Sequence, residues 1–445
     1  MAAKFGSKGE VLKWLAATAA QEIHPGLERM RWVLERLGNP ERRLKFIHIA
    51  GTNGKGSTAA LIASALMQAG YDVGRFTSPS MGGYTDQICF NGAEVSEREL
   101  CEVAAQVREA VEAVAQTPNG ALTSFELTTV LALQYYCHVS FPYYVVWETG
   151  LGGRFDATNV VVPLVSVITS IGRDHTQWLG DTLAEIAAEK AGIIKPGVPV
   201  VAGQMAAEAL DVLRQKAVQT RSTLYEYGKD YRVERLRQVG RRQVFDFVSP
   251  FRRTYEALEI ALAGEHQVRN AAAALMTWEV LRQYLALVFD DEQLRRGLSE
   301  ASWPGRLEEM AGSPLVLLDG AHNPEGMEAL AKALQRSYPQ TRFHLLMGVF
   351  SDKPVKGMLQ AILPHVDSLT VTEPSSERAL PAADLALLAR DVRPELPIEI
   401  IPQWPEALER LRRQHSGRMS GREEAVLVSG SLHLVAEVRR RLVSF

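Results

Sequence analysis

The sequence has few cysteines, no long apolar run and almost no net charge, and each absence excludes a class of protein. The three cysteines, Cys89, Cys101 and Cys137, form no CxxC pair, which argues against a disulfide framework or a zinc site and suits a reducing cytosol. No apolar run approaches the roughly 18 residues of a membrane span, and the first ten residues lack the apolar core of a secretion signal. A net charge of -3 gives no reason to expect nucleic acid or a membrane surface as partner. We therefore expect a cytoplasmic protein.

What is present is the composition of a globular protein with more than one domain. For 445 residues, of which 46% are apolar and 23% charged, two or three domains are expected. Short apolar runs predicted as buried strands lie at residues 46–50, 73–77, 143–147, 165–169 and 199–202. Amphipathic helices lie between them, such as 57–68 and one that starts at Ser96, where Glu99 completes a capping box. This alternation predicts βαβ units and a mainly parallel sheet.

Two further regions follow the alternating pattern. Residues 223–262 contain short alternating β segments, such as 243–248, and predict a small antiparallel subsheet that leads into a helix over 266–285. A second set of strands, each followed by a helical stretch, is predicted at 315–318, 343–347, 368–372, 399–401 and 425–429. We therefore predict an α/β protein with an N-terminal domain over residues 1–302, a linker over 303–306 and a Rossmann-like C-terminal domain over 307–445.

The strongest single motif is Gly51-Thr52-Asn53-Gly54-Lys55-Gly56-Ser57, which follows a predicted strand and opens a helix. Glycines let the backbone wrap around a phosphate, and a helix N-terminus favours its negative charge. Lys55 can reach the outer phosphates, and the Ser57 hydroxyl can serve phosphate or Mg²⁺. The spacing departs from GxxxxGK[ST], because Ile49 stands six residues before Lys55 and Gly56 precedes Ser57. The motif predicts a phosphate-binding loop (P-loop); the alternative is a glycine-rich turn that caps a helix.

This loop resembles the phosphate loop of the folylpolyglutamate and dihydrofolate synthases, the folate branch of the Mur-type ligases. Further motifs follow in the order typical of that family: TSP (77–79), SFE (124–126), ETGLGGRFDATN (148–159), TSIGRDH (169–175), EKAGIIK (189–195), GEHQVRNA (264–271), WPGRLE (303–308), DGAHNP (319–324) and SGSL (429–432). The resemblance covers nearly the whole chain. One segment departs from it, because in residues 80–88 a Gly82-Gly83 pair is inserted and Gln87 stands where arginine is usual. This loop shapes the substrate and metal entrance in the family, so the departure bears on substrate preference and not on the reaction class.

Several side chains stand where a sheet of this kind binds metal ions, since residues at the carboxyl ends of parallel strands face the ligand crevice. Glu148 ends a predicted strand and precedes a glycine-rich turn, so we interpret it as a Mg²⁺ ligand in preference to a capping or surface residue. His175 occupies the equivalent end of a later strand, where a histidine packed in a loop is the alternative. The resemblance implies two Mg²⁺ sites, with Ser78 and Glu148 at the first and His175 at the second, and Ser57 is a further candidate ligand.

A second group of residues matches the pterin-side pocket of the family. The resemblance implies substrate contacts from Thr123, Ser124, Phe125, Glu126, Phe155, Asp156 and Ala157. On its own chemistry, the Asp156 carboxylate suits the donor-rich pyrimidine edge of a pterin, and the Phe125 ring can stack on a pterin face. For Phe125 the alternative is a buried aromatic residue at the start of a helix.

The resemblance also places ATP contacts on segments far apart in the chain, at Asn270, Arg306 and Asp319, in addition to residues 52–57. Asn270 can offer an amide to adenine, and the Arg306 guanidinium can fork onto phosphate oxygens. Asp319 follows the predicted strand at 315–318, and we expect His322 to contact the transferring phosphate or the ribose. Together with Lys55, both Asp319 and His322 are candidate catalytic residues.

Lys190 is the fourth catalytic candidate, because it matches a lysine that is carbamylated in the family. A free ammonium beside two Mg²⁺ ions would be repelled, and burying it unpaired would be costly. Reaction of the neutral amine with CO₂ replaces the positive charge with an anion suited to Mg²⁺. The alternative is an ordinary salt bridge to Glu148 or Glu189.

The resemblance implies an ATP-dependent ligase that adds L-glutamate to a folate-type carboxylate, either dihydropteroate or a folate, and we expect a monomer. Transfer of the γ-phosphoryl group would give an acyl phosphate, which the amino group of glutamate attacks; domain closure would exclude water. One rival is another Mur-type ligase, but an additional uridine-nucleotide domain has little room in the 45 residues before the first strand. The other is a folate-independent P-loop ATPase, which would have no use for residues 124–126 or Asp156.

Overall fold

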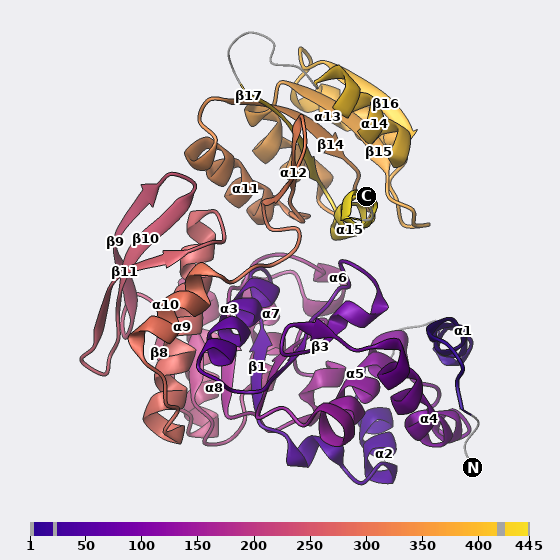
Figure 1. Ribbon diagram of the computed structural model, residues 1–445, viewed down its shortest axis with the longest axis vertical. Coiled ribbons are helices and arrows are strands. Elements are labelled where there is room, and N and C mark those ends of the chain that lie inside the picture. Colours follow the sequence, from indigo (N-terminus) through magenta and orange to yellow (C-terminus); the bar gives the residue numbers. More distant parts are fainter. Residues whose placement is uncertain (1–3, 21–24, 416–422, 444–445) are drawn as a thin grey trace.

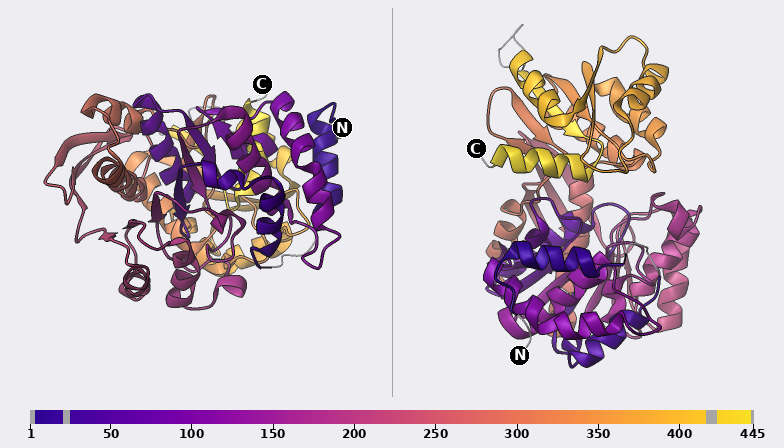
Figure 2. Two further views of the ribbon diagram at one scale, coloured as in Figure 1. Left: turned by 90° about the horizontal axis from the view of Figure 1, so that it is seen from below. Right: turned by 90° about the vertical axis from the view of Figure 1, so that its right-hand side faces the viewer.

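A computed structural model describes residues 4–20, 25–415 and 423–443. The chain forms two α/β lobes, one above the other in Figure 1 and again in the right-hand view of Figure 2. Residues 303–307 carry the chain from the N-terminal lobe to the C-terminal lobe, whose first strand starts at Glu308. The predicted division into residues 1–302, 303–306 and 307–445 stays a prediction.

The N-terminal lobe is built on an eight-stranded sheet in the order β4-β3-β2-β5-β1-β6-β7-β8. Its strands are β1 (Phe46–Ala50), β2 (Val73–Phe76), β3 (Ile88–Phe90), β4 (Ala93–Glu94), β5 (Tyr144–Glu148), β6 (Val165–Ile168), β7 (Val200–Ala202) and β8 (Leu224–Glu226). Along the sheet, neighbouring strands in the run β2-β5-β1-β6-β7-β8 are all parallel. Strands β3 and β4 add an antiparallel edge beside β2. The mainly parallel sheet is therefore confirmed.

Both faces of this sheet are covered, because alternate residues of a strand point to opposite sides. In β1, Ile47 and Ile49 pack into the cluster that contains helices α3 (Lys55–Gln68) and α9 (Glu265–Leu285), whereas Phe46 packs with Phe76 and Trp147 into a separate cluster. The helices of this lobe are α1 (Lys8–Thr18), α2 (Glu28–Arg36), α3 (Lys55–Gln68), α4 (Glu97–Val114), α5 (Ser124–Tyr135), α6 (Thr176–Leu179), α7 (Leu183–Lys190), α8 (Ala207–Thr220), α9 (Glu265–Leu285) and α10 (Asp291–Ser299). The capping box predicted at Ser96 and Glu99 is present at the start of α4.

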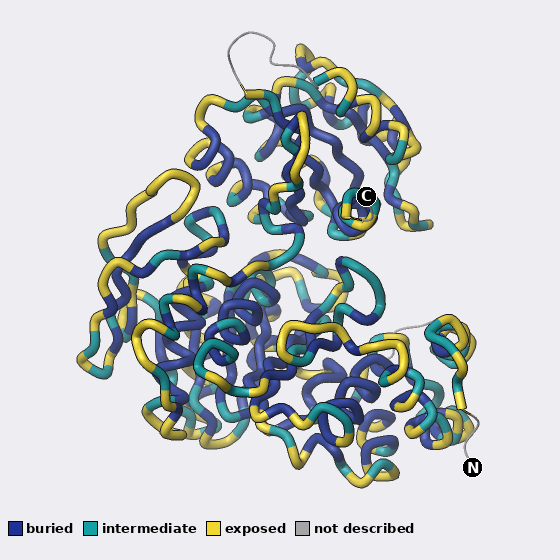
Figure 3. The backbone as a smooth tube through the Cα atoms, in the orientation of Figure 1, coloured by how far each residue is buried: buried dark blue, intermediate teal, exposed yellow. Residues whose placement is uncertain are grey.

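The region predicted as an antiparallel subsheet is only partly so. Strands β9 (Arg232–Val239), β10 (Arg242–Val248) and β11 (Thr254–Ile260) form a three-stranded antiparallel sheet in the order β11-β10-β9. The prediction was wrong for residues 224–226, because β8 pairs parallel to β7 at the edge of the large sheet. Helix α8 connects these two strands, so the segment completes a βαβ unit before the antiparallel strands begin. Figure 3 shows the β9–β10 hairpin as one of the more exposed parts of the lobe.

The C-terminal lobe has a six-stranded sheet in the order β12-β13-β17-β14-β15-β16, parallel except for the β12–β13 pair. Its strands are β12 (Glu308–Met310), β13 (Leu315–Leu318), β14 (Thr341–Met347), β15 (Ser368–Glu373), β16 (Ile398–Gln403) and β17 (Glu423–Ser429). Its helices are α11 (Pro324–Ser337), α12 (Val355–Ile362), α13 (Ala382–Val392), α14 (Trp404–Gln414) and α15 (Leu432–Val443). Most strand residues of the two large sheets are buried, as Figure 3 shows. Among the described helices, none is both long and apolar enough to cross a membrane.

Candidate active site

The glycine-rich loop joins β1 to α3 and is held by the loop that follows β6. Thr169 Oγ1 and Ser170 Oγ donate hydrogen bonds to the Asn53 carbonyl at 2.7 and 3.0 Å, and the Asn53 N–H donates to Ser170 Oγ at 3.0 Å. Gly54 has a φ of +85°, and a Cβ there would lie 2.3 Å from Asn270 Oδ1, so only glycine fits. The loop therefore brings Lys55 to the start of α3 with backbone N–H groups around it, as a phosphate site requires.

Two adjoining cavities surround this loop, and both lobes line them. A cavity of about 480 Å³ is lined by eleven of the predicted residues: Thr52, Asn53, Gly54, Lys55, Gly56, Ser78, Glu148, His175, Lys190, Arg306 and His322. A neighbouring cavity of about 230 Å³ is lined by Ser57, Asn270 and Asp319, and shares Asn53, Gly54, Arg306 and His322 with the first. The structure thus gathers every residue predicted for phosphate, nucleotide or metal around one loop.

Glu148 and Ser57 offer oxygen atoms for a cation at this site. Glu148 is 2% exposed at the end of β5, and burial raises the pKa of its carboxyl to about 7, although Lys55 and the Ser78 N–H lower it. That N–H donates to Glu148 Oε2 at 3.3 Å. The buried Ser57 hydroxyl has no hydrogen-bond partner within the described ranges. A buried carboxylate and an unpartnered hydroxyl beside the loop are oxygen ligands of the kind Mg²⁺ prefers, so the residues fit this ion.

Lys190 is the last residue of α7, and its side chain reaches the same loop. Its side chain is 4% exposed, and Nζ donates to the Gly51 carbonyl at 2.9 Å, while Lys55 Nζ donates to the same oxygen at 3.3 Å. Burial, together with the positive charge of Lys55, lowers the pKa of Lys190 to about 7. Within the part of the chain that the structure describes, neither Glu148 nor Glu189 forms an ion pair with Lys190, and Glu189 lies 3.8 Å from Arg154. A neutral amine, the form that reacts with CO₂, is therefore accessible near neutral pH.

An interdomain cluster around Asp174 was missed at the sequence level. Asp174 Oδ1 accepts a hydrogen bond from Lys353 Nζ at 2.6 Å, and Oδ2 lies 3.4 Å from His322 Nε2 and 3.3 Å from Asn323 Nδ2. Burial alone would raise the pKa of Asp174, but the hydrogen bond and charge of His322, with His175 and Lys353, hold it well below its usual range. His175 itself has its pKa lowered to about 4, by burial first. Asp174 stands in the quoted TSIGRDH motif, but no sequence signal links it to Lys353, 179 residues away.

Asp319 and Asn270, which were predicted to contact ATP, also form hydrogen bonds within the protein. The Asp319 carboxylate accepts hydrogen bonds from the Leu307 and Ala321 N–H groups, at 2.9 and 3.0 Å, and so ties the interdomain segment to the loop after β13. Asn270 Nδ2 donates to Gln267 Oε1 at 2.9 Å, with its Oδ1 against Gly54. Arg306 lines both cavities. A guanidinium at the junction of two cavities is placed to reach a phosphate chain that runs between them.

A third cavity, of about 660 Å³, lies in the N-terminal lobe and is lined by all seven residues predicted to bind the pterin: Thr123, Ser124, Phe125, Glu126, Phe155, Asp156 and Ala157. The two residues of this set that carry carboxylates, Glu126 and Asp156, already have hydrogen-bond partners in the protein. Glu126 closes the capping box of α5 with Thr123 and forms an ion pair with Arg29 at 2.9 Å. Asp156 accepts hydrogen bonds from the Leu151 N–H at 2.7 Å and the Thr158 N–H at 3.0 Å, and burial raises the pKa of its carboxyl. Arg29 and Trp178 also line the cavity and had not been predicted.

Comparisons with known proteins identify the family of the chain. Residues 49–278 match the Mur ligase middle domain, and residues 305–432 match the Mur ligase glutamate ligase domain. A dihydrofolate synthase/folylpolyglutamate synthase of Bacillus subtilis is 37% identical over 98% of this chain and 100% of its own length. A folylpolyglutamate synthase of Lacticaseibacillus casei is 33% identical over 93% of this chain and 94% of its own.

Solved structures give the same result. The folylpolyglutamate synthase of Mycobacterium tuberculosis, complexed with ADP, has a TM-score of 0.89 at 29% identity and covers 97% of both chains. Escherichia coli FolC, in complex with DHPP and ADP, has a TM-score of 0.85 at 29% identity and covers 98% of both chains. The chain therefore belongs to the Mur ligase family and, within it, to the folylpolyglutamate and dihydrofolate synthases, which are ATP-dependent, ADP-forming ligases of glutamate.

Proposed function

We propose that this chain ligates L-glutamate to the carboxylate of a folate-type substrate, with dihydropteroate and reduced folate as the two candidate acceptors. The observation that carries the proposal is that the phosphate cavity and the pterin pocket share a wall. Gly150, Leu151, Gly152 and Leu179 line both the phosphate cavity and the 660 Å³ pocket. A folate-type substrate with its pterin ring in the pocket would extend its carboxylate past the glycine turn toward the P-loop.

The residues divide the reaction between them. Lys55 and Arg306 bind and neutralise the phosphates of ATP, so that the acceptor carboxylate oxygen can attack the γ-phosphorus and release ADP. The glutamate nitrogen then attacks the acyl carbon of the resulting acyl phosphate, loses a proton and releases inorganic phosphate. Ser57, Ser78 and Glu148 would hold one Mg²⁺ and His175 a second, and bound Mg²⁺ supplies positive charge to the phosphates. Closure of the two lobes around the cavity excludes water that would hydrolyse the acyl phosphate.

We further propose that Lys190 carries a carbamate. Its amine is buried, has no carboxylate partner among the described residues and shares the Gly51 carbonyl with the Lys55 ammonium. Converting one of two facing cations into an anion replaces repulsion with attraction and supplies oxygens for Mg²⁺. In ¹³CO₂-equilibrated protein, a carbamate ¹³C NMR signal should appear and should vanish in Lys190→Ala. The matched control is Lys195→Ala, since Lys195 lies outside the cavities and donates to the Asn159 carbonyl at 3.3 Å. A carbamate signal that persists in Lys190→Ala contradicts the proposal.

One assay tests the reaction. Purified protein receives ATP, Mg²⁺ and L-glutamate, with dihydropteroate, with tetrahydrofolate or with neither, and ADP and the glutamylated product are measured. We expect ADP release only when an acceptor is present, with one ADP formed for each glutamate added. The acceptor that is consumed distinguishes a dihydrofolate synthase, a folylpolyglutamate synthase and a bifunctional enzyme. Turnover of ATP that ignores the acceptor would favour the folate-independent ATPase instead.

The proposal also places the enzyme in the cytoplasm as a monomer. Cys89 and Cys137 are buried free thiols and Cys101 is partly exposed, a state that a reducing compartment maintains. Mass measurement by light scattering after size exclusion tests the oligomeric state. A measured mass equal to that of one chain supports the monomer, and a mass equal to that of two chains contradicts it.

A further inference from the structure

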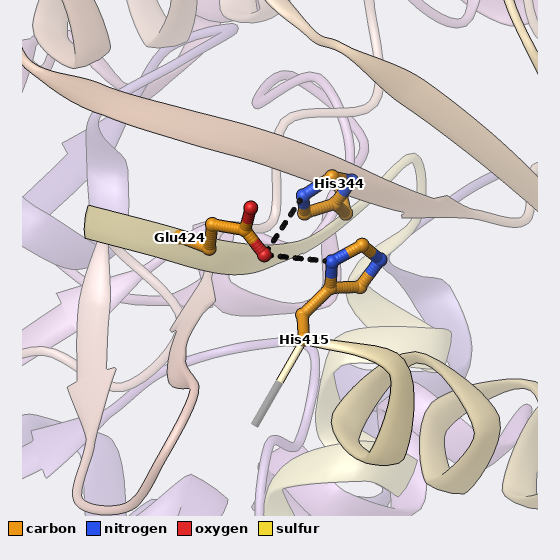
Figure 4. Close-up of side chains that lie close together, drawn as sticks. All are labelled: His344, His415 and Glu424. Carbon is orange, nitrogen blue, oxygen red and sulfur yellow. Dashed lines mark hydrogen bonds and ion pairs between the residues drawn. The ribbon is translucent and has the colours of Figure 1, made fainter. Parts of the chain in front are cut away.

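Three side chains that no step of the ligase reaction uses converge beside the two central strands of the C-terminal sheet. His344 lies on β14, Glu424 on the neighbouring strand β17, and His415 directly after α14, as Figure 4 shows. Glu424 is the second residue of β17, and His344 is the fourth of the seven residues of β14. Asp319 and Ser431, which line the nucleotide cavities, follow the carboxyl ends of β13 and β17. None of the three clustered residues lines these cavities or the 660 Å³ pocket.

The three donor atoms have the spacing of a small metal site. Glu424 Oε2 lies 2.9 Å from His415 Nδ1 and 3.8 Å from His344 Nε2, and all the ligand atoms lie within 4.8 Å of one another. In a tetrahedral zinc site with bonds of about 2.0–2.2 Å, neighbouring ligand atoms are about 3.4 Å apart. The observed separations bracket this value. Two histidines and one carboxylate, with a water as fourth ligand, are a common zinc ligand set.

The contacts of His344 also suit a metal ligand. His344 is 5% exposed, and its Nδ1 lies 2.8 Å from Ser368 Oγ. Its buried Nε2, which lies 3.8 Å from Glu424 Oε2, has no hydrogen-bond partner among the described residues. A hydrogen bond that holds the other ring nitrogen is typical of metal-binding histidines.

We propose that His344, His415 and Glu424 bind a divalent transition-metal ion of the zinc class. The two imidazole rings are stacked, with centroids 3.4 Å apart and planes at 14°, so binding requires one ring to tilt until both nitrogens point at the ion. His415 is the ring free to do so, because it lies beyond the last turn of α14 and its side chain is 20% exposed. With both imidazole rings bound in their neutral form, a divalent ion and one carboxylate would leave a net charge of +1 on the occupied site.

The consequence of binding is structural. The ion would join two adjacent strands to the end of α14, and it would bridge His415 and Glu424, which are nine positions apart in the sequence. Because none of the three ligands lines the nucleotide cavities, binding should raise the stability of the C-terminal lobe without changing the chemistry there. Ligand binding to the folded state raises Tm in proportion to the logarithm of ligand excess.

The test uses the whole protein, stripped with a chelator and free of nucleotide. Zinc is titrated by calorimetry into the native chain, His415→Ala and Glu424→Gln, with His365→Gln as the matched control, since His365 contacts Gln335 at the surface. We expect the native chain and the control to bind one more zinc ion than the two cluster variants. We also expect zinc at about 100 times its Kd to raise the Tm of the native chain by about 5 °C, an increment that both cluster variants lose.

A second measurement locates the ion and covers the case in which a variant folds poorly. Anomalous diffraction at the zinc edge should give a peak between His344, His415 and Glu424 in crystals of the native chain. Equal zinc stoichiometry in the native chain and both cluster variants would overturn the proposal, as would anomalous density only at other sites, such as His175.

Discussion

The nucleotide cavities and the pterin pocket differ in which lobes build them. The 480 Å³ cavity combines P-loop residues with Lys353, Arg378 and His433 of the C-terminal lobe, whereas every residue that lines the 660 Å³ pocket lies between Ala20 and Glu189. The first exists only when the two lobes are in place, and the second is complete within one of them. ATP chemistry should therefore respond to any change in how the lobes meet, and folate binding should not.

Two contacts between the lobes lie on the nucleotide side. Asp174 of the N-terminal lobe pairs with Lys353 of the C-terminal lobe, and Asn323 Nδ2 donates to Asn53 Oδ1 at 3.0 Å. Both contacts lie next to phosphate-cavity residues, so they connect lobe position directly to the loop that holds ATP. Four substitutions test this division.

Lys55→Ala should have the largest effect, a loss of about 10³-fold or more in kcat with folate binding retained. The lysine neutralises phosphate charge that develops during transfer, and one such contact is worth several kcal/mol. The folded state should lose little stability, because the only hydrogen bond that Nζ makes to a described residue goes to the Gly51 carbonyl. Steady-state kinetics, folate titration by fluorescence and a thermal melt measure the three quantities. A variant with near-normal ligation would remove the P-loop from the mechanism.

Lys353→Ala should come next, with a loss of about 100-fold in kcat/KM for ATP. The side chains of Lys353 and Asp174 are 7% and 8% exposed, and breaking a buried ion pair leaves an uncompensated charge at a cost of about 3–5 kcal/mol. Folate Kd should stay within about twofold, because Asp174 and Lys353 do not line the pterin pocket. The matched control is Lys356→Ala on the exposed side of α12. A folate Kd that rises in parallel with the ATP KM would show that the pocket also depends on lobe position.

Asp156→Asn should reverse the pattern, with a rise of about 10-fold in folate KM and a change of less than about twofold in ATP KM. Asparagine keeps the volume but removes the charge that would hold the pterin donors. The same carboxylate accepts the Leu151 and Thr158 N–H groups, so a small loss of stability, about 1 kcal/mol, should accompany the kinetic change. Asp384→Asn, on the exposed first turn of α13, is the control. Equal effects on both substrates would assign Asp156 to the glycine turn that the two cavities share.

Most of the fold and the P-loop could be predicted from local sequence because their causes are local. Apolar runs such as 46–50 and 165–169 must be buried on both faces, and Gly54 followed by Lys55 starts a helix at a phosphate. The error at residues 224–226 shows the limit. A three-residue strand carries almost no periodicity, so its partner is set by the α8 crossover and not by its own composition.

The site residues were predicted where a motif carries them and missed where only the folded chain brings them together. Lys353 and Arg378 belong to no motif, and they reach the phosphate cavity because β14 and β15 end there. For Glu126, in contrast, a motif predicts a role that the contacts of the side chain do not require. Its position in a family motif predicts a substrate contact, yet its carboxylate is engaged by Arg29 and by the capping box of α5. Sequence proximity cannot distinguish a residue that touches the substrate from one that shapes the pocket wall.

Met81→Ala should have the smallest effect and tests the segment that departs from the family. Met81 comes from the N-terminal lobe but is 6% exposed within a hydrophobic cluster of the C-terminal lobe that includes Leu434 and Val435. The Asp86 carboxylate fixes its backbone by accepting the Met81 N–H at 2.7 Å. Truncating a buried methionine costs about 2 kcal/mol or more, but here the gap can close by a small shift of one lobe. We therefore expect a rise of about threefold in ATP KM, a modest fall in Tm and an unchanged folate Kd. Met81→Leu, which conserves volume, should restore both values. A folate Kd that weakens in Met81→Ala while the ATP KM stays constant would show that this loop serves the pterin pocket and not the contact between lobes.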